Sequence, residues 1–166
     1  MQHVCTRRFH FFIFNTMVNL LRTTSSNPDF AFLVRLLDED LLARYGSEQA
    51  QYDKHNKIEN NPTVVIAYLD REPVGCACLK TIDVFTAELK RMYVRPEHRG
   101  KSIGVGILNE LEDWAAELSF GRIILETAQK QPEAINLYKK AGFEIIPNYP
   151  PYDRMEKSIC MAKQII

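Results

Sequence analysis

Two cations and several small residues gather at residues 99–104, which read Arg-Gly-Lys-Ser-Ile-Gly. A strand-like stretch at residues 89–94 comes before them, and apolar residues recur at helical spacing after them, to residue 118. The first amides of a helix have no intrahelical acceptor, the helix dipole is positive there, and glycine lets an anion approach the backbone. The segment therefore predicts a phosphate-binding helix start.

Spacing excludes two of the three phosphate-binding loops that this segment could form. In the P-loop pattern G-x-x-x-x-G-K-[ST], the first glycine would fall on Arg95. The dinucleotide pattern G-x-G-x-x-G, begun at Gly104, requires a third glycine where the chain has Asn109. The remaining pattern is R-x-x-[G]-x-G, with Ser102 in the middle glycine place.

That loop resembles the acetyl-CoA pyrophosphate loop of the GNAT N-acetyltransferase superfamily. The preceding strand E-L-K-R-M-Y-V (residues 88–94) and the later A-I-N-L-Y-K-K-A-G-F (residues 134–143) strengthen the resemblance, which is strong from residue 88 to 143 and weaker before residue 63. It implies acetyl-CoA as co-substrate. The residues that it assigns to acetyl-CoA are Met92, Tyr93, Val94, Arg99, Gly100, Lys101, Ser102, Ile103, Gly104, Gln131 and Tyr138.

The resemblance also implies catalytic roles. Tyr138 would protonate the departing thiolate, and Glu88 would take the proton of the amine through water. The Met92 amide would stabilise the oxyanion. Two alternatives stay open: Tyr138 as a core residue, and Glu88 as a strand carboxylate paired with a neighbouring Lys90 or Arg91.

The acceptor side is less defined by the sequence. Tyr149 and Tyr152 either line the acceptor mouth or stiffen a proline-rich loop. Four acidic residues of the first helical region could attract an amine, although a solvated surface role is the alternative for each; they are Asp38, Glu39, Asp40 and Glu48. The acceptor itself stays unidentified.

The elements that must position these residues alternate along the chain. Asn27 and Pro28 predict a helix start and Gly46 its end, with a second short helix at residues 47–53. Further helices are expected at residues 103–118 and 131–141. Strands are expected at residues 18–21, 63–69, 74–82, 88–94, 122–127, 143–146 and 158–162. Gly75 would mark a bulge or a close approach within its strand.

These elements and the resemblance predict an α/β fold. It is a GNAT-like three-layer α/β/α sandwich with a mixed, mostly antiparallel central sheet that splays between strands 4 and 5. Residues 17–166 form one domain in this interpretation. Residues 1–16 are expected to be a non-essential extension, with Met17 as an alternative start; an added packing strand or an oligomer contact is the other possibility.

Composition narrows the class of protein. Lys+Arg and Asp+Glu both number 21 in 166 residues, so bulk charge favours neither nucleic acid nor a membrane surface. The four cysteines form no C-x-x-C pair, which favours apolar core roles in a reducing cytoplasm over a metal or redox site. The aromatic run at residues 9–14 fits a signal peptide poorly.

The sequence thus predicts a cytoplasmic N-acetyltransferase, monomeric or homodimeric and without a metal. It would transfer an acetyl group to a primary amine by direct attack in a ternary complex, since no nucleophilic Cys or Ser with an adjacent base is evident. The alternative is a non-catalytic acyl-CoA-binding or regulatory module of the same fold.

Overall fold

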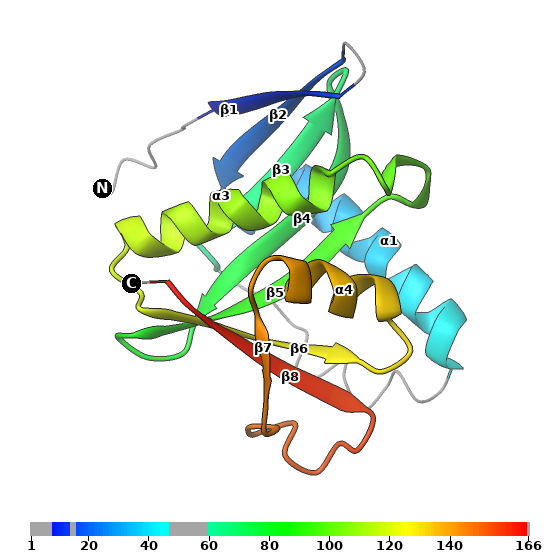
Figure 1. The fold of residues 1–166 in the computed structure, drawn as a ribbon. Coiled ribbons are helices and arrows are strands. Elements are labelled where there is room, and N and C mark those ends of the chain that lie inside the picture. The colour runs from blue at the N-terminus through cyan, green and yellow to red at the C-terminus, as the bar shows by residue number, and fades with distance from the viewer. Residues whose placement is uncertain (1–7, 14–15, 47–59, 166) are drawn as a thin grey trace. The chain divides into compact units, whose positions relative to one another are not determined.

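The computed structural model describes residues 8–13, 16–46 and 60–165, with side chains from Met17 on (Figure 1). The predicted helix at residues 47–53 lies outside these residues. The described elements are β1 (Arg8–Ile13), β2 (Thr16–Thr23), α1 (Pro28–Tyr45), β3 (Val64–Leu69), β4 (Glu72–Thr81), β5 (Thr86–Val94), η2 (Pro96–His98), α3 (Ile103–Glu117), β6 (Arg122–Ala128), α4 (Pro132–Lys140), β7 (Glu144–Ile146) and β8 (Ser158–Gln164).

The strands follow the hydrogen-bonded order β1-β2-β3-β4-β5-β6-β8-β7. The β5–β6 pair is parallel, whereas β1–β2, β2–β3, β3–β4, β6–β8 and β7–β8 are antiparallel. The predicted mixed, mostly antiparallel sheet is therefore confirmed.

The chain divides into two compact units, which are described separately. The first comprises Met1–Cys78 and Arg91–Leu111, and the second comprises Leu79–Lys90 and Glu112–Ile166. Since β4, β5 and α3 each cross a boundary, all three contribute residues to both units.

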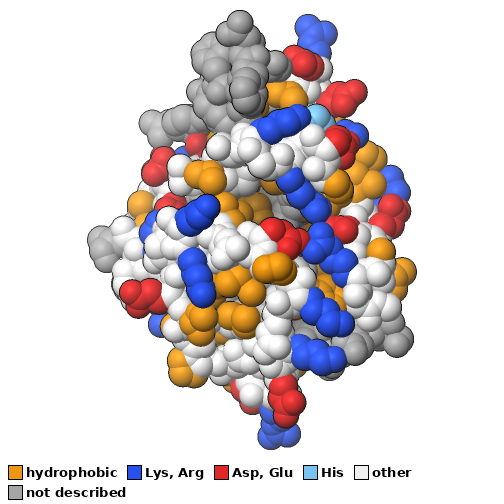
Figure 2. All heavy atoms as spheres, turned by 45° about the vertical axis from the view of Figure 1, so that its right-hand side comes forward, with side chains coloured by type: hydrophobic (Ala, Val, Ile, Leu, Met, Phe, Trp, Pro, Cys, Tyr) orange, Lys and Arg blue, Asp and Glu red, His pale blue; other side chains and the backbone are white. Residues whose placement is uncertain are grey.

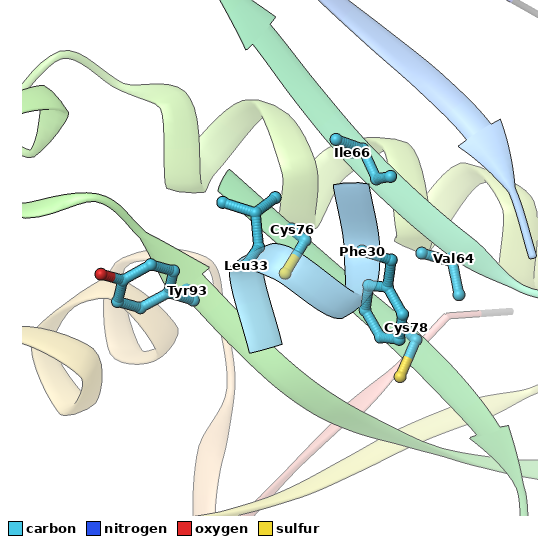
Figure 3. Packing of buried hydrophobic residues seen from close by; sticks show 7 residues of the cluster. All are labelled: Phe30, Leu33, Val64, Ile66, Cys76, Cys78 and Tyr93. Atoms are coloured by element: carbon cyan, nitrogen blue, oxygen red, sulfur yellow. The ribbon is translucent and has the colours of Figure 1, made fainter. Parts of the chain in front are cut away.

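In the first unit, α1 covers one face of the sheet. Asn27 caps the helix by accepting a hydrogen bond from the Asp29 amide at 2.9 Å, and Gly46 ends it with a φ of 56°, as the sequence predicted. The core beneath the helix joins α1 to strands β3, β4 and β5 (Figure 3). It consists of Phe30, Leu33, Val64, Ile66, Cys76, Cys78 and Tyr93.

The opposite face of this unit is covered by the start of α3. Cys76 points into the α1 core, so its neighbour Gly75 faces the other way. A Cβ at Gly75 would lie 3.0 Å from Ile107 Cδ1 and 2.9 Å from the Tyr93 carbonyl oxygen. Gly75 therefore marks a close approach, one of its two predicted roles, and the first unit has the three layers of an α/β/α sandwich.

The β5–β6 ladder of the second unit is shorter than either of its strands. The β5–β6 ladder pairs Thr86 with Arg122 and ends where Leu89 pairs with Leu125, although β6 continues to Ala128 and β5 to Val94. Because β1 adds a strand at the N-terminal edge, β5 and β6 are the predicted strands 4 and 5. The predicted splay is thus confirmed.

Three described cysteines are free and fully buried. Cys76 and Cys78 lie in the α1 core, and Cys160 lies on β8. Burial raises the pKa of the Cys76 thiol well above its ordinary value, and burial likewise raises the pKa of Cys160 to about 11. All three are core thiols, the role that the sequence favoured.

A strand boundary near β4 differs from the sequence prediction, and α3 adds two features. The turn before β4 needs only Asp70 and Arg71, both with positive φ, so β4 begins two residues earlier than expected. Just after α3, Ser119 takes the left-handed conformation, with a φ of 66°. Glu110 of α3 is buried in an ion pair with Arg22 of β2.

The N-terminal strand, the helices and the surface each add one observation. Residues 8–13 form β1, paired with β2 from Arg8–Leu21 to Ile13–Thr16. None of the helices in the described parts of the chain is both long and apolar enough to cross a membrane. The face drawn in Figure 2 carries both basic and acidic side chains, and several of the basic ones follow one another down the middle of the view.

Candidate active site

The predicted phosphate loop lies in the first unit, between η2 and α3. Gly100 and Ser102 both adopt left-handed backbone, with φ values of 74° and 59°. Ile103 and Ile107 are buried and fix the first turn of α3 against the core. The loop therefore leads its amides into a helix N-terminus, where the first turn lacks intrahelical acceptors.

Ser102 is the residue that departs from the family pattern. Its φ of 59° is the conformation that glycine adopts without cost, whereas a residue with a Cβ is strained there by about 1 kcal/mol or more. The backbone keeps the glycine-like turn even though serine occupies it.

Arg99 holds the start of the loop. Its Nε donates to the Val94 carbonyl oxygen at 2.8 Å, and its Nη2 pairs with Asp40 Oδ2 at 3.0 Å. The guanidinium also lies 5.7 Å from the Tyr93 ring centroid. Lys101 donates to the Glu97 carbonyl oxygen at 3.2 Å. The Arg99 side chain thus links α1, the end of β5 and the loop.

The end of β5 precedes this loop in the same unit. Arg91 has a φ of 59° and an ion pair to Asp38 of α1, so regular strand geometry is interrupted just before Met92. Tyr93 turns its ring into the α1 core. Asp38 and Asp40, considered as amine attractants or solvated residues, both pair with arginines, and the Asp38 side chain is still 50% exposed, as the solvated alternative expected.

In the second unit, Glu88 lies on a buried polar face. It is 4% exposed, its Oε1 accepts a hydrogen bond from the Tyr149 hydroxyl at 2.9 Å, and Lys90 Nζ lies 3.8 Å from the same oxygen. Lys90 donates in turn to the Tyr152 hydroxyl at 2.6 Å. The strand pair with Lys90 that the sequence allowed is present, together with a tyrosine contact that it did not predict.

Tyr138 lies on the inner face of α4 and is 5% exposed. Its ring is tilted against Phe143 with a centroid distance of 5.9 Å. Burial, reinforced by the charge of Glu126, raises the pKa of Tyr138 well above its ordinary value. The hydroxyl therefore stays protonated at neutral pH, as a proton donor must.

Glu126 of β6 was not singled out from the sequence. Its Oε1 accepts a hydrogen bond from Ser158 Oγ at 2.7 Å, and burial raises its pKa. The charges of Glu88 and Lys90 also act on Glu126, and Glu126 acts on Tyr138. The candidate acid and base thus share a neighbour. A lone carboxylate inside the apolar strand R-I-I-L-E-T was the available signal.

Gln131 is the other predicted cofactor residue of the second unit. It stands at the N-cap position of α4 without a side-chain capping hydrogen bond, and its Oε1 accepts a hydrogen bond from Thr127 Oγ1 at 3.1 Å. The predicted site residues thus form two groups. Unit 1 holds Met92, Tyr93, Val94, Arg99, Gly100, Lys101, Ser102, Ile103 and Gly104, and unit 2 holds Glu88, Gln131 and Tyr138.

A family model described as the acetyltransferase (GNAT) family matches residues 30–143. This match covers more than half of the chain and includes the loop, β5 and α4. The chain therefore belongs to the GNAT acetyltransferase family.

Similarity to individual proteins agrees with the family match. An IAA acetyltransferase of Azospirillum brasilense is 36% identical over 94 residues, which are 55% of this chain and 61% of that protein, so the match spans less than two thirds of the relative. An acetyltransferase structure from Streptococcus agalactiae shares the fold, with a TM-score of 0.69, 24% identity and coverage of 89% and 98% of the two chains.

One further solved structure carries a bound molecule. It is the PaiA N-acetyltransferase of Thermoplasma acidophilum in complex with coenzyme A. It has a TM-score of 0.55 and 26% identity, and the similarity covers 61% of this chain and 59% of that one.

Proposed function

We propose that this protein is an acetyl-CoA-dependent N-acetyltransferase that transfers the acetyl group to a primary amine. The loop at residues 99–104 is the observation that carries the proposal. Its two left-handed residues, Gly100 and Ser102, lead backbone amides into the N-terminus of α3. Family membership and the coenzyme A bound to PaiA support the same reading.

The reaction proposed is direct attack in a ternary complex. The nitrogen lone pair of the neutral amine forms a bond to the acetyl carbonyl carbon, and the oxyanion accepts a hydrogen bond from the Met92 amide. The carbon–sulfur bond then breaks, the thiolate takes the proton of the Tyr138 hydroxyl, and the proton that the attacking nitrogen still has to lose passes to the Tyr138 oxygen and restores the hydroxyl. Glu88 receives the proton that the ammonium form of the amine loses before the attack.

A cytoplasmic location is part of this proposal. It is supported by the three free, buried thiols of Cys76, Cys78 and Cys160, which suit a reducing compartment.

The first experiment measures binding. Calorimetry with acetyl-CoA should show that Arg99→Ala lowers affinity about tenfold or more, because a charge-assisted hydrogen bond is worth roughly 1.5–3 kcal/mol. Arg95→Ala is the matched control, since it removes an equal charge from a residue that pairs with Glu97 at 2.7 Å and Glu72 at 3.6 Å. Equal affinities for both variants would remove Arg99 from the cofactor site.

The second experiment separates the enzyme from the non-catalytic alternative. Release of free thiol from acetyl-CoA is followed with a panel of amino acids, polyamines, aminoglycosides and peptide amines. Acceleration by one class of amine identifies the acceptor. Tight binding of acetyl-CoA without acceleration by any amine would favour the binding module, and absence of binding would reject both functions.

A further inference from the structure

The Glu88 carboxylate is the proposed base, yet it is nearly closed off from solvent. It is 4% exposed, and its Oε1 already accepts the hydrogen bond of the Tyr149 hydroxyl at 2.9 Å. Tyr149 is only partly buried. A tyrosine hydroxyl is thus the hydrogen-bond partner of Glu88, for which the family resemblance implied a water molecule.

The loop before β8 holds Tyr149 in place. The side-chain amide of Asn148 donates to the carbonyl oxygens of Tyr152, Met155 and Ser158 at 3.2–3.3 Å. The Cys160 amide donates to Asn148 Oδ1 at 3.3 Å. Because Asn148 ties the loop to itself and to β8, the adjacent tyrosine has a fixed position.

Aromatic packing fixes the ring as well. Tyr149 and Tyr152 meet edge to face, with ring centroids 5.6 Å apart and an interplanar angle of 80°. Lys90 lies 5.3 Å from the Tyr152 ring centroid and donates to its hydroxyl. The Tyr149 ring can therefore lose its hydroxyl and keep its packing.

We propose that Tyr149 is a further catalytic residue, which relays the proton of the amine acceptor to Glu88. This inference rests on the proposed function. The N–H bond of the ammonium breaks as an O–H bond forms at Tyr149 Oη, while the former tyrosine proton passes to Glu88 Oε1. The electron pair stays on nitrogen, which becomes the neutral nucleophile, and Glu88 afterwards returns the proton to water.

The two transfers occur together. Burial and the adjacent charge of Glu88 raise the pKa of Tyr149 far above its ordinary value, so a free tyrosinate does not form at neutral pH. The hydroxyl can still gain one proton as it gives up another. The titratable groups that face Glu88 from the surrounding strands and loop are Lys90, Glu126, Tyr149, Tyr152 and Cys160.

The test is the pH–rate profile of Tyr149→Phe. Loss of the relay should lower kcat/KM for the amine about tenfold or more below the amine pKa, where a proton must be removed. The difference should vanish as the pH rises past the amine pKa. Tyr68→Phe is the matched control, because the Tyr68 hydroxyl also donates to a carboxylate, Asp29 Oδ2 at 2.6 Å.

A double-mutant cycle with Glu88→Gln tests whether Tyr149 acts through Glu88. If Tyr149 acts through Glu88, the Tyr149→Phe change should have almost no further effect on kcat/KM once Glu88→Gln is present. Additive losses, a profile identical to the wild type, or a pH-independent loss that follows the melting temperature would each overturn the relay.

The relay and the proposed function fail in different ways. If the wild-type protein transfers acetyl groups and the pH–rate profile of Tyr149→Phe is unchanged, the proposed function stands and only the relay is rejected. If the wild-type protein accelerates thiol release with none of the amines, both the proposed function and the relay are rejected.

Discussion

Replacement of Tyr138 by phenylalanine is the sharpest test of the proposed chemistry, because it removes one oxygen atom. Within the described residues, no hydrogen bond to the Tyr138 hydroxyl is found, and the ring packs against Phe143. The variant should therefore differ in stability by less than about 1 kcal/mol, or about 2–4 °C in melting temperature for a chain of this size.

The catalytic loss should be much larger. A positioned general acid contributes at least about 10²-fold, which corresponds to about 2.7 kcal/mol of transition-state stabilisation. The expected result is a fall in kcat with the acetyl-CoA affinity unchanged, because the pyrophosphate loop is untouched. The selenium analogue of acetyl-CoA, whose leaving selenol is more acidic, should show a smaller loss.

The assay is thiol release with the best amine found, at several pH values, alongside thermal melting. Tyr68→Phe again provides a control with the opposite pattern: loss of its bond to Asp29 should lower the melting temperature and leave kcat intact. If Tyr138→Phe keeps its kcat and loses only stability, Tyr138 is a core residue and the reasoning is refuted.

Three other predictions concern Ser102 of the loop at residues 99–104, the carboxylate of Glu126, and residues 1–16. Ser102→Gly should retain both the melting temperature and the affinity for acetyl-CoA. Ser102→Val should lower both, because a β-branched residue is strongly disfavoured at a φ of 59°. Equal melting curves for the two variants would contradict this prediction. Since the pKa of Glu126 is raised above 4.5 by burial, the stability linked to it is present below the unfolded pKa and is lost as the pH rises through the folded pKa. Glu126→Gln should therefore have a higher melting temperature than the wild type at about pH 8 but not at about pH 4. A lower melting temperature at pH 8 would contradict this prediction. Deletion of residues 1–16, which removes β1, should leave kcat/KM nearly unchanged; a large loss would make the strand part of the working enzyme.

Local signals in the sequence predicted much of the fold. Asn27, Pro28 and Gly46 mark the ends of α1 because capping depends on residues that are neighbours in the chain. The helix start that follows residues 99–104 could likewise be predicted from neighbouring residues, whereas phosphate binding there stays a prediction. The confirmed splay between β5 and β6 came from the family resemblance rather than from the chemistry of single residues.

Pairings between distant segments could not be predicted in this way. Arg22 and Glu110 form a buried pair although they are 88 residues apart, and no local pattern in the sequence links them. For the same reason, the sequence did not predict the hydrogen bond of Tyr149 to Glu88, which is 61 residues away. It also did not predict the ion pairs of Asp38 and Asp40 with arginines. The sequence predicted elements and short motifs, but the partners of charged side chains depend on the packing of those elements.

The buried cysteines have a practical consequence for the measurements above. A disulfide reagent that detects coenzyme A reacts with thiolates, and Cys76 and Cys160 are both enclosed and shifted to higher pKa. In a Cys5→Ser background, the folded enzyme should therefore give little colour of its own, so the signal reports turnover. Unfolding would release three reactive thiols, Cys76, Cys78 and Cys160, and the rate of labelling without substrate would measure how often the core opens.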